Sequence, residues 1–318
     1  MIEMEKYYRL SGKVSPAYAA YFVTGAVLTA ALSVLYAIGM FYIPSVYLSV
    51  LVTILFAAAA GFIAAKAAEW GQARNAAVWG LSLLAYFAIF TYVHLTAYAA
   101  VVFRATAVID LEGFWSLLKG PSYTYRLFTE AIIPYGVWSF TTGSGSSSNA
   151  SAVSGGVLVG IWVIEHLTVL GGSAWTFRAL VRRPFFEETK RWGVERVCDA
   201  VWEYQPEAAF AGIREALESG RLDYFRSLKP APSYDRYCRL SCYADAENAH
   251  ENVYLSLTNS LTVSNKKGKA KTTDKHIVRH LIISETSYRR LEAFAKEAGR
   301  EDPDSEERPS GEAEWETV

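Results

Sequence analysis

The feature that most constrains this sequence is a long stretch without charge. From Pro16 to Ala65 there is no Lys, Arg, Asp or Glu, whereas charged residues are frequent before Pro16 and after Arg178. A helix needs about 20 apolar residues to cross the hydrocarbon core of a bilayer. The uncharged stretch has room for two such helices, so the sequence predicts an integral membrane protein.

Four apolar segments are long enough to cross a bilayer: residues 18–43, 46–65, 76–103 and 157–177. The first is longer than the about 7–15 apolar residues of a signal peptide, so we interpret it as a retained span. A tight turn is expected at Pro44. The predicted fold class is membrane α-helical, with a four-helix transmembrane bundle and a small cytosolic α+β domain at the C-terminal end.

The orientation follows from the positive charges, because segments next to a span on the cytoplasmic side carry an excess of Lys and Arg. The N-terminal tail, the link between spans two and three and the segment after span four are richest in them, and four spans place all three on one side. These segments contain Lys6, Arg9, Lys13, Lys66, Arg74, Arg178, Arg182, Arg183, Lys190, Arg191 and Arg196. We therefore expect a plasma (inner) membrane protein with both termini in the cytoplasm.

The predicted organisation has four parts. Residues 1–15 form a cytosolic tail, and residues 16–177 form the membrane domain with an extracytoplasmic loop at 104–156. That loop is rich in aromatic residues, which favour the membrane–water interface, and short interfacial helices are predicted at 111–118 and 125–133. Residues 178–299 form the cytosolic α+β domain. The acidic tail at 300–318 is poor in apolar residues and is predicted to be disordered.

Within the cytosolic domain, residues 194–202 show a helical pattern, and a second helix is predicted between Pro206 and Gly220. Alternating apolar and polar residues predict strands at 237–243, 253–258 and 277–283. Ser284 is a predicted N-cap for a helix at 285–298.

Two ionisable residues lie near the midpoint of the fourth span, Glu165 and His166. A carboxyl group at this depth costs roughly 2.5–3.5 kcal/mol on insertion scales, so it must face other helices or water. His94 in the third span is expected within one or two helical turns of Glu165. The three residues are a candidate intramembrane polar site. Two interpretations stay open: a proton or ion relay, and a hydrogen bond that joins helices.

A second candidate site is the basic turn between the last two predicted strands, which contains Lys266, Lys267, Lys269 and Lys271. Basic clusters bind anionic lipid headgroups or acidic partners. A solvated turn with no partner explains the same residues.

Small residues recur at four-residue spacing in two spans, at Ala57, Gly61 and Ala65 and at Gly156 and Gly160. Such faces allow close helix approach. Close packing within the chain is the preferred interpretation for the first set, and both sets are candidate faces for a homo-oligomer.

No cofactor or metal is predicted. Cys198, Cys238 and Cys242 are expected to be reduced thiols in the cytosol, and the pair at 238 and 242 lacks the further ligands of a zinc site. No phosphate-binding glycine loop and no catalytic motif is present. A net charge of −1 gives no reason to expect a nucleic-acid partner.

The order of motifs resembles a group of uncharacterised bacterial four-span membrane proteins with a cytosolic zinc-ribbon-like C-terminal domain. The resemblance rests on a short set of motifs: Gly61 leading to Arg74-Asn75, Tyr135-Gly136-Val137-Trp138-Ser139, Trp162 with Glu165, Pro184-Phe185 with Trp192, and Ile282-Ile283-Ser284. It implies cysteine pairs where Phe186 and Thr189 stand here, and near Cys242 and Asp245. The resemblance therefore implies a zinc site that this chain has lost, and a role for Glu165.

Two hypotheses of function follow. The first is a non-enzymatic interaction or sensing protein in the lipid bilayer, whose cytosolic domain docks a protein partner. The alternative is a small oligomeric transporter or proton-linked channel that uses Glu165, His166 and His94.

Overall fold

The structure is a computed structural model that describes residues 6–43, 46–104, 111–136, 139–142, 149–181, 183–245, 252–264 and 270–300. The chain divides into two compact units. One contains Ser11–Arg182, and the other combines the residues up to Leu10 with those from Arg183 onward.

The first unit is built on four long helices: α1 (Tyr18–Tyr42), α2 (Val46–Trp70), α3 (Ala76–Arg104) and α7 (Gly155–Leu180). All four are long and apolar enough to cross a membrane, as the sequence predicted. The predicted end of the second span at Ala65 is too early. Helix α2 continues to Trp70, and its last turns hold an ion pair between Lys66 and Glu69 at 2.6 Å.

The helices pack mainly as two pairs, α1 with α3 and α2 with α7. The small residues of α2 make the second pair close. The Ser173 hydroxyl of α7 donates a hydrogen bond to the Ala57 carbonyl at 3.0 Å, and Gly61 lies against Ser173 and Thr176. The face with Ala57 and Gly61 is therefore used within the chain. A Cβ at Gly156 or Gly160 would meet no described atom within 4 Å, so an oligomer contact there stays a prediction.

A layer of short helices connects α3 to α7. It consists of α4 (Leu111–Lys119), α5 (Pro121–Leu127), the π-helical turn η1 (Phe128–Ile132) and α6 (Ile133–Tyr135). Helices were predicted here. The inward side chains Phe114, Leu117 and Phe128 are buried in one cluster with residues of α3 and α7. A hairpin of β1 (Ser139–Thr142) and β2 (Asn149–Ala152) precedes α7.

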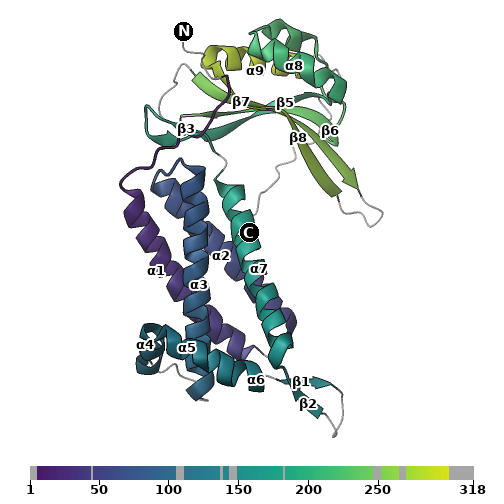
Figure 1. Cartoon of the computed structure of the whole chain (residues 1–318). Helices are drawn as coiled ribbons and strands as arrows, with labels where there is room; N and C mark the ends of the chain where they lie inside the picture. Colours follow the sequence, from purple (N-terminus) through teal and green to yellow (C-terminus); the bar gives the residue numbers. More distant parts are fainter. Residues whose placement is uncertain are drawn as a thin grey trace. The chain divides into compact units, whose positions relative to one another are not determined.

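The second unit contains an antiparallel sheet in the order β5-β6-β7-β8. Its strands are β5 (Val194–Glu203), β6 (Arg236–Ala244), β7 (Asn252–Ser264) and β8 (Ala270–Ser284). Helices α8 (Phe210–Glu218) and α9 (Glu285–Arg300) cover one face (Figure 1). A short hairpin of β3 (Phe185–Phe186) and β4 (Arg191–Trp192) precedes the sheet, and 3-10 turns η2 (Glu207–Ala209) and η3 (Leu222–Ser227) flank α8.

The predicted helix at 194–202 is wrong, because this segment is strand β5. The pairing of β5 with β6 shifts register between Val197 and Val201, which marks a β-bulge. Cys198 and Trp202 of this strand are both buried in the core and are four residues apart. That spacing imitates the repeat of a helix, which explains the error.

The other predicted elements of this unit are present with changed ends. The strands β7 and β8 are longer than predicted, and the second helix begins as the turn η2. The backbone N–H of Ser287 donates to the Ser284 hydroxyl at 3.1 Å, so Ser284 is the N-cap of α9. Gly220 has a φ of +71°, as a glycine after a helix end often has.

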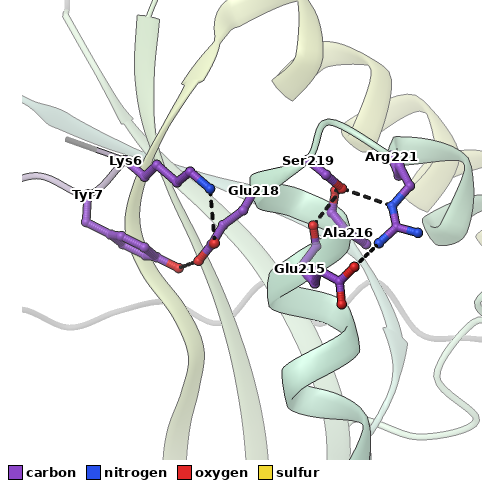
Figure 2. A network of polar contacts seen from close by, with 7 residues as sticks. All are labelled: Lys6, Tyr7, Glu215, Ala216, Glu218, Ser219 and Arg221. Carbon is purple, nitrogen blue, oxygen red and sulfur yellow. Dashed lines mark hydrogen bonds and ion pairs between the residues drawn. The ribbon is translucent and has the colours of Figure 1, made fainter. Parts of the chain in front are cut away.

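The N-terminal residues form an arm that the sequence did not predict. Tyr7 pairs with Leu281 as an added strand at the edge of β8, with backbone bonds of 2.9 Å on either side of the pair. Figure 2 shows Tyr7 and Lys6 meeting Glu218 of α8. The Tyr7 hydroxyl donates to Glu218 at 2.5 Å, and the Lys6 ammonium lies 3.5 Å from the same carboxylate.

The next residues of the arm pair within the first unit. Val14 bridges to Ala73 in the link between α2 and α3, and the backbone N–H of Gly12 donates to the Arg74 carbonyl at 2.9 Å. The Asn75 side chain adds a bond to the Gly12 carbonyl at 3.0 Å. The arm is thus fixed at both ends, in the sheet unit and in the bundle unit.

Candidate functional site

Glu165 lies on α7 with its side chain only 9% exposed. The Tyr36 hydroxyl of α1 contacts its carboxyl oxygen Oε1 at 2.6 Å, as a hydrogen bond. A buried polar group without a partner costs several kcal/mol, so this contact explains how the helix accommodates a carboxyl group at mid-length.

Tyr36 also joins α2 to the site. Its hydroxyl lies 2.7 Å from the Thr53 hydroxyl, and either group can donate. Thr53 in turn lies 2.9 Å from the backbone carbonyl of Ser49, one turn earlier in α2. Tyr36 and Thr53 are both buried. A continuous chain of polar contacts therefore runs from α7 through α1 to α2.

His94 brings α3 to the same carboxyl group. Its Nε2 lies 3.6 Å from Oε1 of Glu165, and the side chain is 2% exposed. The distance suits an ion pair but exceeds an ordinary hydrogen bond. The imidazole stacks on the Phe90 ring, with centroids 5.3 Å apart and an angle of 18° between the planes. Within the part of the chain that the structure describes, Nδ1 of His94 has no hydrogen-bond partner.

His166 turns its ring toward its own helix. Its Nδ1 lies 2.9 Å from the carbonyl oxygen of Trp162. A carbonyl only accepts, so Nδ1 carries the hydrogen and Nε2 of the neutral ring keeps a lone pair. This Nε2 is buried and meets no hydrogen-bond partner among the described residues. The ring centroids of His94 and His166 are 5.9 Å apart.

The structure therefore brings together all three residues that the sequence proposed. All four long helices contribute to the site, because Tyr36 and Thr53 complete it from α1 and α2. We did not predict these two. Hydroxyl groups inside an otherwise apolar span are a signal that could have suggested them, although Thr and Tyr also occur in spans without such a role.

Two of the cavities bounded by described residues lie in the bundle. One is an open apolar groove of about 580 Å³ between the start of α1 and α3, at Tyr18 and Ser82. The other is a crevice of about 10 Å³ next to Phe90 and Val169, at the lower limit for one water molecule. Neither is lined by Glu165 or His94. The burial of the site thus favours a polar contact between helices over an open pathway.

A metal needs several ligands around one point. Glu165, His94 and His166 do not form such a group, and no set of three His, Cys, Asp or Glu suited to a metal occurs among the described residues.

The basic turn is only partly within the described residues. Lys266, Lys267 and Lys269 lie outside them. Lys271 is exposed on β8, and Lys275 further along the strand pairs with Glu207 at 2.5 Å. Binding of lipid or of a partner at this turn stays a prediction.

The cysteines belong to the core of the sheet unit. Burial raises the pKa of Cys238 to about 12 and of Cys242 to about 11, and it also raises the pKa of Cys198. Cys242 faces Tyr288 of α9, whereas Phe186 packs on Tyr254, which alternation along paired strands places on the opposite face. Cys242 and Phe186 therefore do not meet, as the two halves of a zinc ribbon would.

Comparison of the chain with protein-family models, with curated proteins and with solved structures finds no match. The family resemblance of the sequence therefore stays a prediction.

Proposed function

We propose that this chain is an integral membrane protein with four spans and cytoplasmic termini, and that it acts as a non-enzymatic interaction or sensing protein. The support for membrane insertion is the distribution of side chains in the bundle. Val27, Leu35 and Ile164 are among many aliphatic side chains that are more than half exposed on the outside of the helices. Glu165 and His94 are buried inside. This arrangement suits lipid as the solvent.

Aromatic side chains mark the two ends of the spans. Tyr21, Trp70 and Trp175 are exposed where α1 starts and where α2 and α7 end. Tyr42 and Tyr47 are exposed at the opposite end, together with Trp115 and other rings of the α4–α6 layer. Tyr and Trp concentrate at both membrane–water interfaces, so the pattern supports a bilayer between these two groups.

The pairing of the N-terminal arm with the sheet unit supports an even number of membrane spans. Residues 6–8 pair with β8, although the chain crosses the whole bundle between them. The N-terminal arm and the sheet unit therefore lie on one side of the membrane. The Lys and Arg residues next to the spans favour the cytoplasm for that side.

One observation carries the interaction or sensing role: the chain links the sheet unit to the bundle twice, after Leu10 and before Arg183. Backbone pairing fixes the first link at Tyr7 and Val14. These two covalent links support a role in which binding at the sheet unit and the state of the bundle influence each other. Burial raises the pKa of the Cys198, Cys238 and Cys242 thiols, which makes them poor nucleophiles.

Topology and docking need separate tests. Reporter fusions after Val318 and at Ser146 should face opposite compartments, and a shared compartment would overturn the four-span topology. For docking, a photoreactive residue at Tyr234, Val197 or Val263, which are exposed in the sheet unit, should cross-link one defined protein in intact membranes. The same residue at Leu167 on the bundle surface is the control and should cross-link lipid. Absence of a defined protein from all three sheet positions would count against docking.

A second candidate function is proton-linked transport by an oligomer. The observation in its favour is the pair of buried imidazole nitrogens without described partners, Nδ1 of His94 and Nε2 of His166, close to a carboxyl group. Vesicles that contain the purified chain should then show a proton or solute flux that Glu165→Gln abolishes. Equal flux in both proteins would remove this candidate.

A further inference from the structure

The polar chain at Glu165 has more contacts than its hydroxyl groups have hydrogens. Three contacts lie in series: Glu165 to Tyr36 at 2.6 Å, Tyr36 to Thr53 at 2.7 Å, and Thr53 to the Ser49 carbonyl at 2.9 Å. Each contact is short enough to need a hydrogen between its oxygens. Tyr36 and Thr53 supply one hydrogen each, and the Ser49 carbonyl supplies none. One hydrogen is missing.

The burial of the two hydroxyl residues disfavours water as its source. Tyr36 is 4% exposed and Thr53 is 5% exposed. The remaining group in the series is the carboxyl of Glu165, which becomes a donor when it is protonated.

We propose that Glu165 is a proton-binding site that holds its proton as a carboxylic acid in this structure. The acid then donates to Tyr36, Tyr36 donates to Thr53, and Thr53 donates to the Ser49 carbonyl. All three contacts are satisfied in one direction. The inference rests on the proposed membrane insertion, and it names the proton as the signal that this site takes up.

The charges around the site agree with the neutral form. Tyr36 faces Glu165 from α1 and Thr53 extends the series into α2, while α3 contributes His94 and α7 contributes His166. The sequence has no Lys or Arg from Pro16 to Ala65 or from Ala76 to Phe103. Arg178 follows Glu165 on α7 by roughly three and a half turns. A lone carboxylate without a fixed positive partner is costly in a bilayer.

Loss of the proton reverses the series. With a carboxylate at Glu165, Tyr36 must donate to it, and Thr53 must then donate to Tyr36 instead of to Ser49. Nε2 of His94, 3.6 Å from the same carboxyl oxygen, can accept the proton, and its transfer there produces an ion pair of carboxylate and imidazolium. The two states differ in the hydrogen bonds between α7, α1 and α2, which gives a sensing protein two defined conditions.

Infrared spectroscopy of the full chain in lipid nanodiscs tests the proposal. A buried carboxylic acid gives a C=O stretching band well separated from carboxylate bands. This band should be present in the unaltered protein and absent in Glu165→Gln. It should shift to higher frequency in Tyr36→Phe, which removes the hydrogen-bond acceptor. Glu69→Gln is the matched control and should leave the band unchanged, because Glu69 is paired with Lys66.

Other results would overturn the proposal. If Glu165→Gln removes only carboxylate bands, the site is ionised in the unaltered protein. His94→Phe then identifies where the proton resides, because an acid band that appears only in this variant means an ion pair with His94. Helical circular dichroism checks that each variant is folded. The reporter fusions test insertion independently, so a wrong topology and a wrong protonation state give different results.

Discussion

The bundle and the sheet unit place their polar residues in opposite positions. In the bundle, Glu165 and His94 are buried, and Leu35 is exposed. In the sheet unit, Leu255 and Leu257 are buried, and Arg289, Arg290 and Lys296 of α9 are exposed. The two units thus bury opposite kinds of side chain, as the proposed insertion of the bundle into lipid predicts.

The difference also concerns what stabilises each unit. The sheet unit buries a large apolar cluster, and removal of apolar surface from water is the dominant favourable term for such a core. In the proposed membrane setting, lipid tails are as apolar as Leu, so this term would not hold the bundle helices together. Close packing at Gly61 and the hydrogen bonds at Glu165 take its place. Equivalent truncations should therefore have unequal effects in the two units.

The largest effect is expected at Trp202, which is fully buried between the sheet and Phe225. Trp202→Ala should lower the free energy of unfolding of the sheet unit by about 3–5 kcal/mol, through lost burial and a cavity. Hydrogen exchange at the amides of β5 to β8, measured with the full chain in nanodiscs, reports this loss.

Trp202→Phe is the matched control. The indole N–H of Trp202 is buried with no hydrogen-bond partner among the described residues, so its removal costs little. The phenyl ring keeps much of the packing, and the loss should be well below that of Trp202→Ala. Equal losses for the two variants would show that packing at Trp202 is not what stabilises the sheet unit.

A smaller effect is expected at Tyr36 in the bundle. Tyr36→Phe keeps the ring contacts with Phe56 and His94 and removes only the hydroxyl. Hydrogen bonds between membrane helices contribute about 0.6 kcal/mol on average and about 1.7 at most, so the bundle should lose an amount in this range. Reversible unfolding in mixed micelles measures it.

Two controls sharpen the contrast between the units. Tyr42→Phe alters an exposed ring and should have no measurable effect. Leu35→Ala removes an exposed apolar side chain, and it should also cost little if lipid surrounds it. A loss of several kcal/mol at Leu35 would mean that this face is buried against protein, which contradicts the inside-out pattern of the bundle.

The sequence predicts the bundle helices well because charges are missing from them, but it does not predict how they pair. Helices that are apolar all round carry little information about which face points inward. Glu165, His166 and His94 stand out as the ionisable residues of the spans, whereas Tyr36 and Thr53 become visible only when α1 and α2 are placed beside α7. The sequence therefore predicted the ionisable residues of the site and missed its two hydroxyl residues.

In the sheet unit the errors have local causes. Cys198 and Trp202 of β5 are both buried and lie four residues apart, a spacing that shares one face in a helix and in a strand alike. The arm escaped prediction because a single pair between Tyr7 and Leu281 leaves no periodic pattern in the sequence. Strand β6, in whose sequence Cys238, Leu240 and Cys242 alternate with Arg239 and Ser241, was predicted to within one residue at each end. Local irregularity, and not fold class, limited the prediction here.

The arm offers a third and smaller effect. Tyr7→Phe removes the hydrogen bond to Glu218, which should lower the stability of the arm by about 0.5–1.5 kcal/mol. The backbone N–H of Ile282 donates to the Lys6 carbonyl, so its hydrogen exchange should become faster. Lys6→Ala removes an exposed ion pair, which typically contributes about 0–1 kcal/mol, and should change this exchange less. Unchanged exchange at Ile282 in Tyr7→Phe would show that the Tyr7 hydroxyl does not hold the arm.

The smallest effect concerns pH and again separates the units. Burial, together with the charges of Arg279 and His276, lowers the pKa of His280 from 6.5 to about 4. The unfolded chain therefore takes up a proton on this residue at higher pH than the folded one does. Between pH 6.5 and about 4 the unfolded state gains stability relative to the folded state, so the sheet unit should become less stable as pH falls through this window.

The effect is expected to be modest because the imidazole is only half-buried among Tyr8, Tyr243 and the neighbouring charges. His280→Gln should remove this part of the pH dependence in the sheet unit, measured as the melting temperature at several pH values. The amide of Tyr8 donates to the His280 carbonyl, so arm exchange provides a second readout. Identical pH slopes in His280→Gln and the unaltered protein would assign acid sensitivity to other groups of the sheet unit. A pH slope that persists in both His280→Gln and Glu165→Gln belongs to neither residue. Proton uptake would then not distinguish the sheet unit from the bundle.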